Sequence, residues 1–120
     1  MNGLMVAIGG GMGALARYGL SLLPISKQFP VATFLTNLLG AFLIGLIAAQ
    51  AGRLPPKSVL LLKTGVCGGF TTFSTFSLET VMLLQNGRYG LGALYIVLSL
   101  GCCLAGVAAG LWLGGRVGQR

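Results

Sequence analysis

Residues 65–80 read GVCGGFTTFSTFSLET, and they interrupt an otherwise apolar segment with glycines, hydroxyl side chains and evenly spaced phenylalanines. Adjacent glycines at Gly68 and Gly69 weaken an α-helix, and the hydroxyl groups that follow can satisfy the backbone groups that a broken helix exposes. Irregular backbone persists at membrane depth only where protein buries it or where it lines a wet cavity. The stretch therefore predicts a helix that is broken near residues 68–72 and faces protein or water.

The composition is that of a membrane protein. Of the 120 residues, 55% are hydrophobic and 8% are charged, and the mean hydropathy is +0.91, which is far from the composition of soluble domains. Apolar runs long enough to cross a roughly 30 Å hydrocarbon core as helices cover residues 4–23, 31–51, 59–84 and 91–113. We expect an all-α membrane protein in which residues 1–120 form a single domain of four transmembrane helices, the third broken in mid-membrane.

Several classes of function are excluded by the residues present. The chain has no histidine, and its four expected spans leave no soluble domain to carry chemistry, so we do not expect an enzyme. Its three cysteines lie in apolar segments without metal or disulfide spacing and are expected to be small packing residues: Cys67, Cys102 and Cys103. The first span is not expected to be a cleavable signal, because no basic residue precedes it and Arg17 interrupts it.

The net charge of +7 comes from basic residues that are scattered singly at the ends of spans. This distribution argues against a nucleic acid partner and indicates anchoring in a lipid bilayer. The residues expected in loops are Arg53, Lys57, Arg116 and Arg120 on one side and Lys27 and Arg88 on the other. So small a bias specifies orientation weakly, and it leaves open both a single orientation and an antiparallel dimer of chains inserted in opposite directions.

Polar side chains inside the first two spans are candidates for function. Arg17 either reaches back to the membrane surface or lines a positive vestibule that gathers anions. Asn37 lies four residues after Thr33, on the same helical face. An amide in hydrocarbon costs free energy unless it is bonded, so Asn37 is either a bond between helices or a donor to a passing ion.

The third span carries an aromatic stripe, with phenylalanines spaced by three residues along one face of a helix: Phe70, Phe73 and Phe76. Aromatic rings present a positive edge as well as a negative face. Because Ser74 and Ser77 are interleaved with these rings just beyond the expected break, the stripe indicates the lining of a pore.

Two further polar features follow along the chain. Glu79 is the only acidic residue, and it is either a proton or cation site within the membrane or a partner that neutralises a nearby basic residue. Tyr95 and Ser99 lie four residues apart in the last span, where they form either a track of hydroxyl groups or part of a packing surface.

Three motifs in this order resemble the small fluoride channels of the Fluc or CrcB family: GALARY at residues 13–18, TFLTNLLG at residues 33–40 and CGGFTTFSTFSLE at residues 67–79. The resemblance covers essentially the whole chain. It implies a dual-topology homodimer of antiparallel four-helix subunits with two fluoride pores. Such a multi-pass protein of the plasma membrane exports fluoride passively and protects the cell from fluoride toxicity.

The resemblance also implies roles for individual residues. Asn37 would donate to fluoride, and Phe73 and Phe76 would turn their ring edges toward the anion. Arg17 would make the vestibule positive, and Glu79 matches a glutamate whose role the resemblance leaves open. The implied polar track comprises Thr33, Ser74, Ser77, Tyr95 and Ser99.

A structural sodium ion at the dimer axis is the one cofactor that the resemblance implies. Its ligands would be the backbone carbonyl groups of Gly68 and Thr71 from both subunits. Fluoride is small and strongly hydrated, so a pore must replace its water with donors that do not hold it too tightly. Neutral amide and hydroxyl groups, with a fixed positive charge at the axis, meet both requirements.

Two other classes of membrane protein are alternatives. A small drug/proton antiporter is also a short four-helix dimer, but it needs a carboxylate deep in its cavity, and the only candidate, Glu79, lies beyond the expected break. A purely structural membrane subunit would leave the pattern of phenylalanines and hydroxyl groups without a reason.

Overall fold

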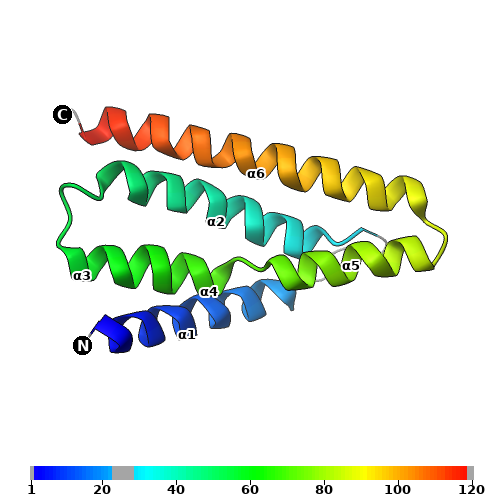
Figure 1. Cartoon of the computed structure of the whole chain (residues 1–120), viewed down its shortest axis with the longest axis horizontal. Helices are drawn as coiled ribbons and strands as arrows, with labels where there is room; N and C mark the ends of the chain where they lie inside the picture. The colour runs from blue at the N-terminus through cyan, green and yellow to red at the C-terminus, as the bar shows by residue number, and fades with distance from the viewer. Residues whose placement is uncertain (1, 23–28, 119–120) are drawn as a thin grey trace.

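The computed structural model describes residues 2–22 and 29–118, and every regular element in these ranges is a helix (Figure 1). In chain order the elements are α1 (Asn2–Ser21), α2 (Val31–Gln50), α3 (Pro56–Val59), the π-helix η1 (Leu60–Cys67), α4 (Gly68–Phe70), α5 (Phe73–Gln85) and α6 (Tyr89–Gly118). Lys27 and Arg120, two basic residues used above to compare the sides of the membrane, lie outside the described residues.

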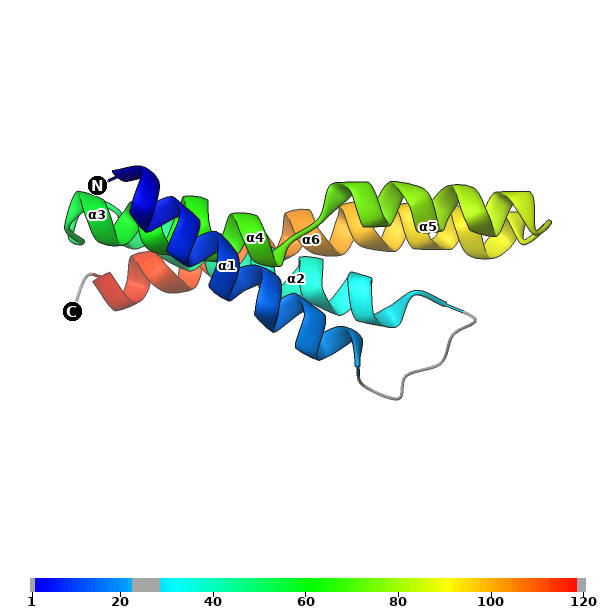
Figure 2. The same ribbon diagram turned by 90° about the horizontal axis from the view of Figure 1, so that it is seen from below.

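The helices form an elongated bundle of 48 × 30 × 22 Å. Elements α3 to α5 follow one another as a single interrupted rod, and the beginning of α1, the α2–α3 connection and the end of α6 lie at the same end of the bundle (Figure 1). Figure 2 shows α1 crossing this rod near α4, just before the interruption. Large apolar side chains such as Leu15, Val97 and Leu104 are exposed, as expected for a surface that lipid covers.

Three segments are long and apolar enough to cross a membrane: Val31–Gln50, Pro56–Gln85 and Tyr89–Arg116. The helix α1 has the same length as α2, but its glycines and Arg17 make it less apolar. The prediction of an all-helical membrane protein is therefore confirmed for the described part of the chain.

The interruption lies later than the adjacent glycines indicated. Gly68 is helical, with φ −63° and ψ −38°, and Gly69 belongs to α4. The extended backbone begins at Thr71 (φ −82°, ψ 155°) and continues through Thr72 (φ −148°, ψ 118°). The break therefore lies within the predicted range of residues 68–72, at its end, and Gly69 is helical in contact with Gly10 of α1.

That contact depends on small residues along both helices. A Cβ atom on Gly69 would collide with the backbone of Gly10, and one on Gly13 would collide with the carbonyl oxygen of Val66 and lie 2.7 Å from the amide nitrogen of Phe70. Gly9 and Gly13 are both buried against η1 and α4. Backbones approach this closely in lipid only where side chains are minimal.

A second tight crossing joins α2 to α6. A Cβ atom on Gly45 would collide with the carbonyl oxygen of Val107, and one on Gly110 would collide with that of Phe42. The two crossings place α2 between α6 and the interrupted rod, as Figure 1 shows. This arrangement brings the polar residues of α2 next to the break.

We expect Gly13→Ala to destabilise the protein, because the added methyl group has no space between α1 and η1. Overpacking of this kind typically costs about 1–3 kcal/mol. Gly11→Ala is the matched control, since nothing lies within 4 Å of a Cβ atom there. Heat unfolding in detergent should show a lower midpoint for the Gly13 variant alone; equal midpoints for the two variants would contradict the packing described.

Candidate functional site

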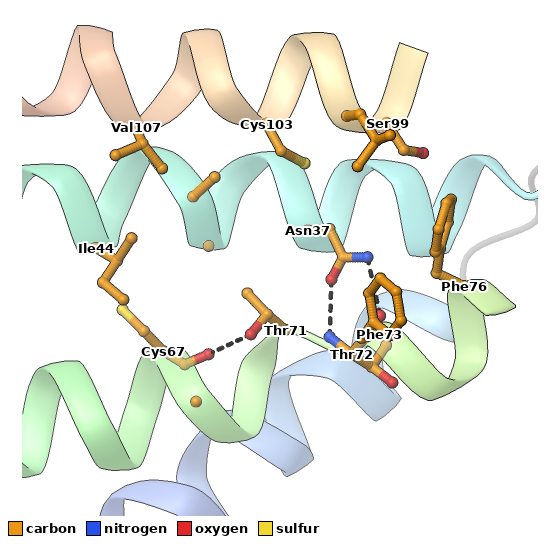
Figure 3. Close-up of a pocket in the computed structure, with 14 residues that line it drawn as sticks. Asn37, Ile44, Cys67, Thr71, Thr72, Phe73, Phe76, Ser99, Cys103 and Val107 are labelled. Carbon is orange, nitrogen blue, oxygen red and sulfur yellow. Dashed lines mark hydrogen bonds between the residues drawn. The ribbon is translucent and has the colours of Figure 1, made fainter. Parts of the chain in front are cut away.

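Asn37 of α2 holds the extended segment by two hydrogen bonds. Its Nδ2 group donates to the carbonyl oxygen of Thr72 at 3.0 Å, and the amide of Thr72 donates to its Oδ1 atom at 2.8 Å (Figure 3). One turn further along α2, a Cβ atom on Gly40 would collide with the Cγ2 methyl group of Thr71. Asn37 and Gly40 therefore form a surface that receives the interrupted backbone.

Hydroxyl groups satisfy other backbone groups at the break. The Thr71 hydroxyl donates to the carbonyl oxygen of Cys67 at 2.9 Å. The amide of Thr75 donates to the Thr72 hydroxyl oxygen at 3.2 Å, so Thr72 caps α5. Thr72 is at the N-cap position, which hydroxyl residues favour.

Two carbonyl groups lose their usual donors as a result. In a continuous helix the amide of Thr72 would donate to the Gly68 carbonyl, and the amide of Thr75 would donate to that of Thr71. Here these amides donate to Asn37 and to the Thr72 hydroxyl instead. Carbonyl oxygens freed by unwound helices are suitable ligands for sodium, so the carbonyl oxygens of Gly68 and Thr71 fit the sodium ion that the family resemblance implies.

Arg17 lies next to the same break. Its Nε group donates to the carbonyl oxygen of Gly69 at 3.3 Å, and its side chain is half-buried. Arg17 also lines a cavity of about 80 Å³ together with hydroxyl residues of three elements. These are Ser21, Thr33, Thr36 and Thr75, with Thr72 at the break.

A larger groove of about 330 Å³ is lined by residues of α2, α6, the break and the helices on either side of it (Figure 3). It brings together several of the residues proposed from the sequence: Asn37, Phe73, Phe76 and Ser99, with Gly68 and Thr71 at its edge. The Phe73 and Phe76 ring centroids are 5.6 Å apart, and the planes meet at 47°. Phe73 is 75% exposed and Phe76 is 8% exposed, so the first ring lies at the surface of the chain and the second is packed inside it.

Ser99 stands out among the groove residues. It is 6% exposed, and its Oγ atom is the one buried side-chain oxygen or nitrogen without a hydrogen-bond partner in the part of the chain that the structure describes. A buried hydroxyl group of this kind costs free energy. It is available to a ligand or water molecule in the groove.

Tyr95 is fully buried beneath the groove. Its hydroxyl group donates to the Glu79 Oε1 atom at 3.0 Å. Its ring lies 5.0 Å from that of Phe76 and 5.4 Å from that of Phe29, measured between centroids. Glu79 is thus connected to the groove through Tyr95 and Phe76.

Other residues of the predicted polar track do not line the groove. Thr33 borders the smaller cavity with Arg17. Ser74 is exposed, and the Ser77 hydroxyl donates to the carbonyl oxygen of Phe73 at 2.9 Å. Of the five track residues, Ser99 therefore lines the groove, Thr33 lines the smaller cavity, Ser74 and Ser77 lie on α5, and Tyr95 is buried outside both cavities.

Sequence reasoning missed the central part that Thr72 plays. Its backbone binds Asn37, and its side chain both caps α5 and bonds the hydroxyl group of Thr75 at 3.1 Å. The signal was present, because a threonine three residues before another hydroxyl residue, at the start of an amphipathic run, resembles a helix N-terminus.

Comparison with known proteins gives the same family as the three motifs. The family described as "CrcB-like protein, Camphor Resistance (CrcB)" matches residues 4–111. The chain belongs to the CrcB family. A relative from Ruminiclostridium cellulolyticum is 48% identical, over 94% of this chain and 92% of its own length. A relative from Salmonella arizonae is 45% identical, over 92% and 91% respectively.

Both relatives bear the name "Fluoride-specific ion channel FluC". The family resemblance inferred from the motifs is thereby confirmed. Because the matches cover nearly the full length of each protein, they include every CrcB motif quoted above.

We expect Ser99→Ala to leave stability unchanged or to raise it, since the Ser99 hydroxyl has no partner to lose. Thr80→Val is the matched control, because the buried Thr80 hydroxyl donates to the carbonyl oxygen of Phe76 at 2.8 Å. Loss of that bond should cost about 1 kcal/mol. Heat unfolding in detergent checks both changes, and a lower midpoint for Ser99→Ala would show that its hydroxyl group has a structural partner.

Proposed function

We propose that this CrcB protein is a fluoride-selective channel that exports fluoride passively across the plasma membrane and so protects the cell from fluoride toxicity. Relatives that match almost the whole chain are named fluoride-specific ion channels, and the protein is accordingly a channel and not an enzyme. The observation that carries the proposal is the groove in which Asn37, Phe73 and Phe76 lie together.

The groove has the chemistry that fluoride requires. Its lining contains no charged side chain, so nothing in it holds an anion by full charge. One hydrogen of the Asn37 amide is used by Thr72, which leaves the second as a donor. The Ser99 hydroxyl group is free as well, and the edges of Phe73 and Phe76 supply weaker positive potential.

In this proposal, the other residues of the polar track extend the fluoride path beyond the groove. Tyr95 and Thr33 would continue it below the groove, and Ser74 and Ser77 would continue it along α5. Arg17, beside hydroxyl groups in the smaller cavity, would make the vestibule positive. Glu79 would orient the Tyr95 hydroxyl group, to which it is bonded.

We propose that the working unit is an antiparallel homodimer in which α1 is the fourth span. Thr71 and Thr72 are half-buried in the single chain, and Phe73 is exposed beside them. Irregular backbone cannot face lipid, so a second copy of the chain is the natural cover for this face. The weak bias of the basic residues permits insertion in both directions.

A sodium ion at the axis of this dimer would be held by the Gly68 and Thr71 carbonyl groups of both copies. The support for this proposal is that both carbonyls have lost their helical donors. The ion would supply a fixed positive charge that attracts anions without contact.

The small drug/proton antiporter is not favoured. Its coupling carboxylate would have to be Glu79, and this carboxylate accepts a hydrogen bond from the buried Tyr95. The relatives that cover the chain are named as channels.

Reconstitution in liposomes tests the proposed function directly. Vesicles loaded with potassium fluoride or potassium chloride should release fluoride rapidly and chloride at the rate of protein-free vesicles, because neutral donors matched to a small anion serve chloride poorly. Ion-selective electrodes follow both ions after valinomycin is added. Fluoride release no faster than from protein-free vesicles would refute the proposal.

A pair of variants tests the ring edges within the same assay. Phe76→Ile removes a ring that lines the groove, and we expect fluoride release to fall about tenfold or more. Phe34→Ile makes the same change in a ring that packs on Phe29 at 6.5 Å, outside the groove residues. Equal rates for the two variants would remove Phe76 from the path.

Removal of sodium tests the proposed cation. Protein purified and reconstituted with N-methylglucamine in place of sodium should lose fluoride flux and dimer stability together, because the carbonyl groups at the axis would repel one another without a cation. Flux and heat unfolding, each measured against sodium concentration, should recover in parallel. Full flux and unchanged stability without sodium would contradict the site.

A further inference from the structure

The Asn37 amide is bonded to the backbone of Thr72 on both of its polar sides, at 2.8 and 3.0 Å. We infer that Asn37 is a positioning residue: its paired bonds to Thr72, here called the Asn37–Thr72 clamp, keep the rod broken at Thr71 and Thr72. The inference deepens the proposed channel function and rests on it, since it assigns Asn37 a task besides donation to the anion.

Nothing covalent imposes the break. Residues 57–120 contain no proline, and proline is the usual cause of a sharp interruption in a membrane helix. The glycines before the break are helical. An extended backbone at this place must therefore be maintained by side chains that satisfy its polar groups better than a continuous helix would.

Side chains of the neighbouring helices α1 and α2 satisfy the polar groups of the break. Asn37 is hydrogen-bonded to both the amide and the carbonyl group of Thr72, and Arg17 donates a hydrogen bond to the carbonyl oxygen of Gly69. Gly40, which follows Asn37 by three residues, leaves the space that the Thr71 methyl group occupies. Figure 3 shows the Asn37 amide directed at Thr72, with both dashed bonds on the same residue.

The clamp also determines which carbonyl is free. If the Thr72 amide were released from Asn37, its nearest alternative would be the helical bond to the Gly68 carbonyl. That bond would occupy the oxygen proposed for the cation and would turn the Phe73 ring, on the next residue, about the rod axis. Asn37 thus couples the lining of the groove to the carbonyl groups at the break.

Magic-angle-spinning NMR of the full chain in lipid bilayers tests the clamp without any transport measurement. With Asn labelled at 13Cγ and Thr at 15N, we expect a direct dipolar coupling between Asn37 and Thr72 in the unsubstituted protein. In Asn37→Leu, which is similar in size and makes neither bond, the Cα resonances of Thr71 and Thr72 should move from extended toward helical values.

Two further variants make the result specific. Asn37→Asp keeps an acceptor for the Thr72 amide, so both Cα resonances should stay near their original extended values. Gln50→Leu is the matched control on α2, because the Gln50 amide also donates to a backbone carbonyl, that of Gly114 at 2.6 Å, but far from the break. It should leave Thr71 and Thr72 unchanged.

The clamp is refuted if the Asn37–Thr72 coupling is absent, if Asn37→Leu leaves both Cα resonances in place, or if Gln50→Leu moves them equally. Absence of the coupling in the unsubstituted protein would refute the clamp even where a variant does not fold. Because these measurements contain no fluoride, they are independent of the proposed function, whose own failure would be the absence of fluoride release from liposomes.

Discussion

The structure depends on one constraint: the backbone at Thr71 and Thr72 is extended in the middle of an apolar rod, and its polar groups have to be bonded there. Four of the polar groups at the break have partners other than those of a continuous helix. The Thr72 amide and carbonyl bond Asn37, the Thr75 amide bonds the Thr72 hydroxyl, and the Gly69 carbonyl bonds Arg17. The polar residues of three segments distant in sequence are explained by this single interruption.

Bringing those partners within reach requires close helix contacts, which explains the glycines at the helix crossings. Gly13 and Gly69 allow α1 to lie directly against η1 and α4, so that the Arg17 side chain reaches the break. Gly45 and Gly110 hold α2 against α6 in the same way. Because lipid is as apolar as the helices, the hydrophobic effect does not drive the helices together. Close packing at small residues does so instead.

The sequence was sufficient for the helical membrane fold, the family and the need for Asn37 to be bonded, because hydropathy, long motifs and the cost of a buried amide are local properties. It predicted the break within residues 68–72 but not which of these residues are extended. Glycine weakens a helix intrinsically, but Gly69 is helical in contact with Gly10 of α1, and only the tertiary structure reveals this contact. The π-helix η1 and the bond from Tyr95 to Glu79 depend on packing in the same way. The expectation that Cys67 is a buried packing residue is confirmed, at 2% exposure.

The positions of the charged residues follow from the same need for hydrogen-bond partners. Arg17 and Glu79 are each bonded outside the groove, to the Gly69 carbonyl and to the Tyr95 hydroxyl group. The groove itself is lined by neutral donors and aromatic rings. A full charge there would bind an anion too tightly to release it or would exclude it, whereas an amide that already gives one hydrogen to Thr72 has only a modest capacity left. The bonds that maintain the break therefore also keep the groove weakly attractive, which is the condition for rapid passage of an ion.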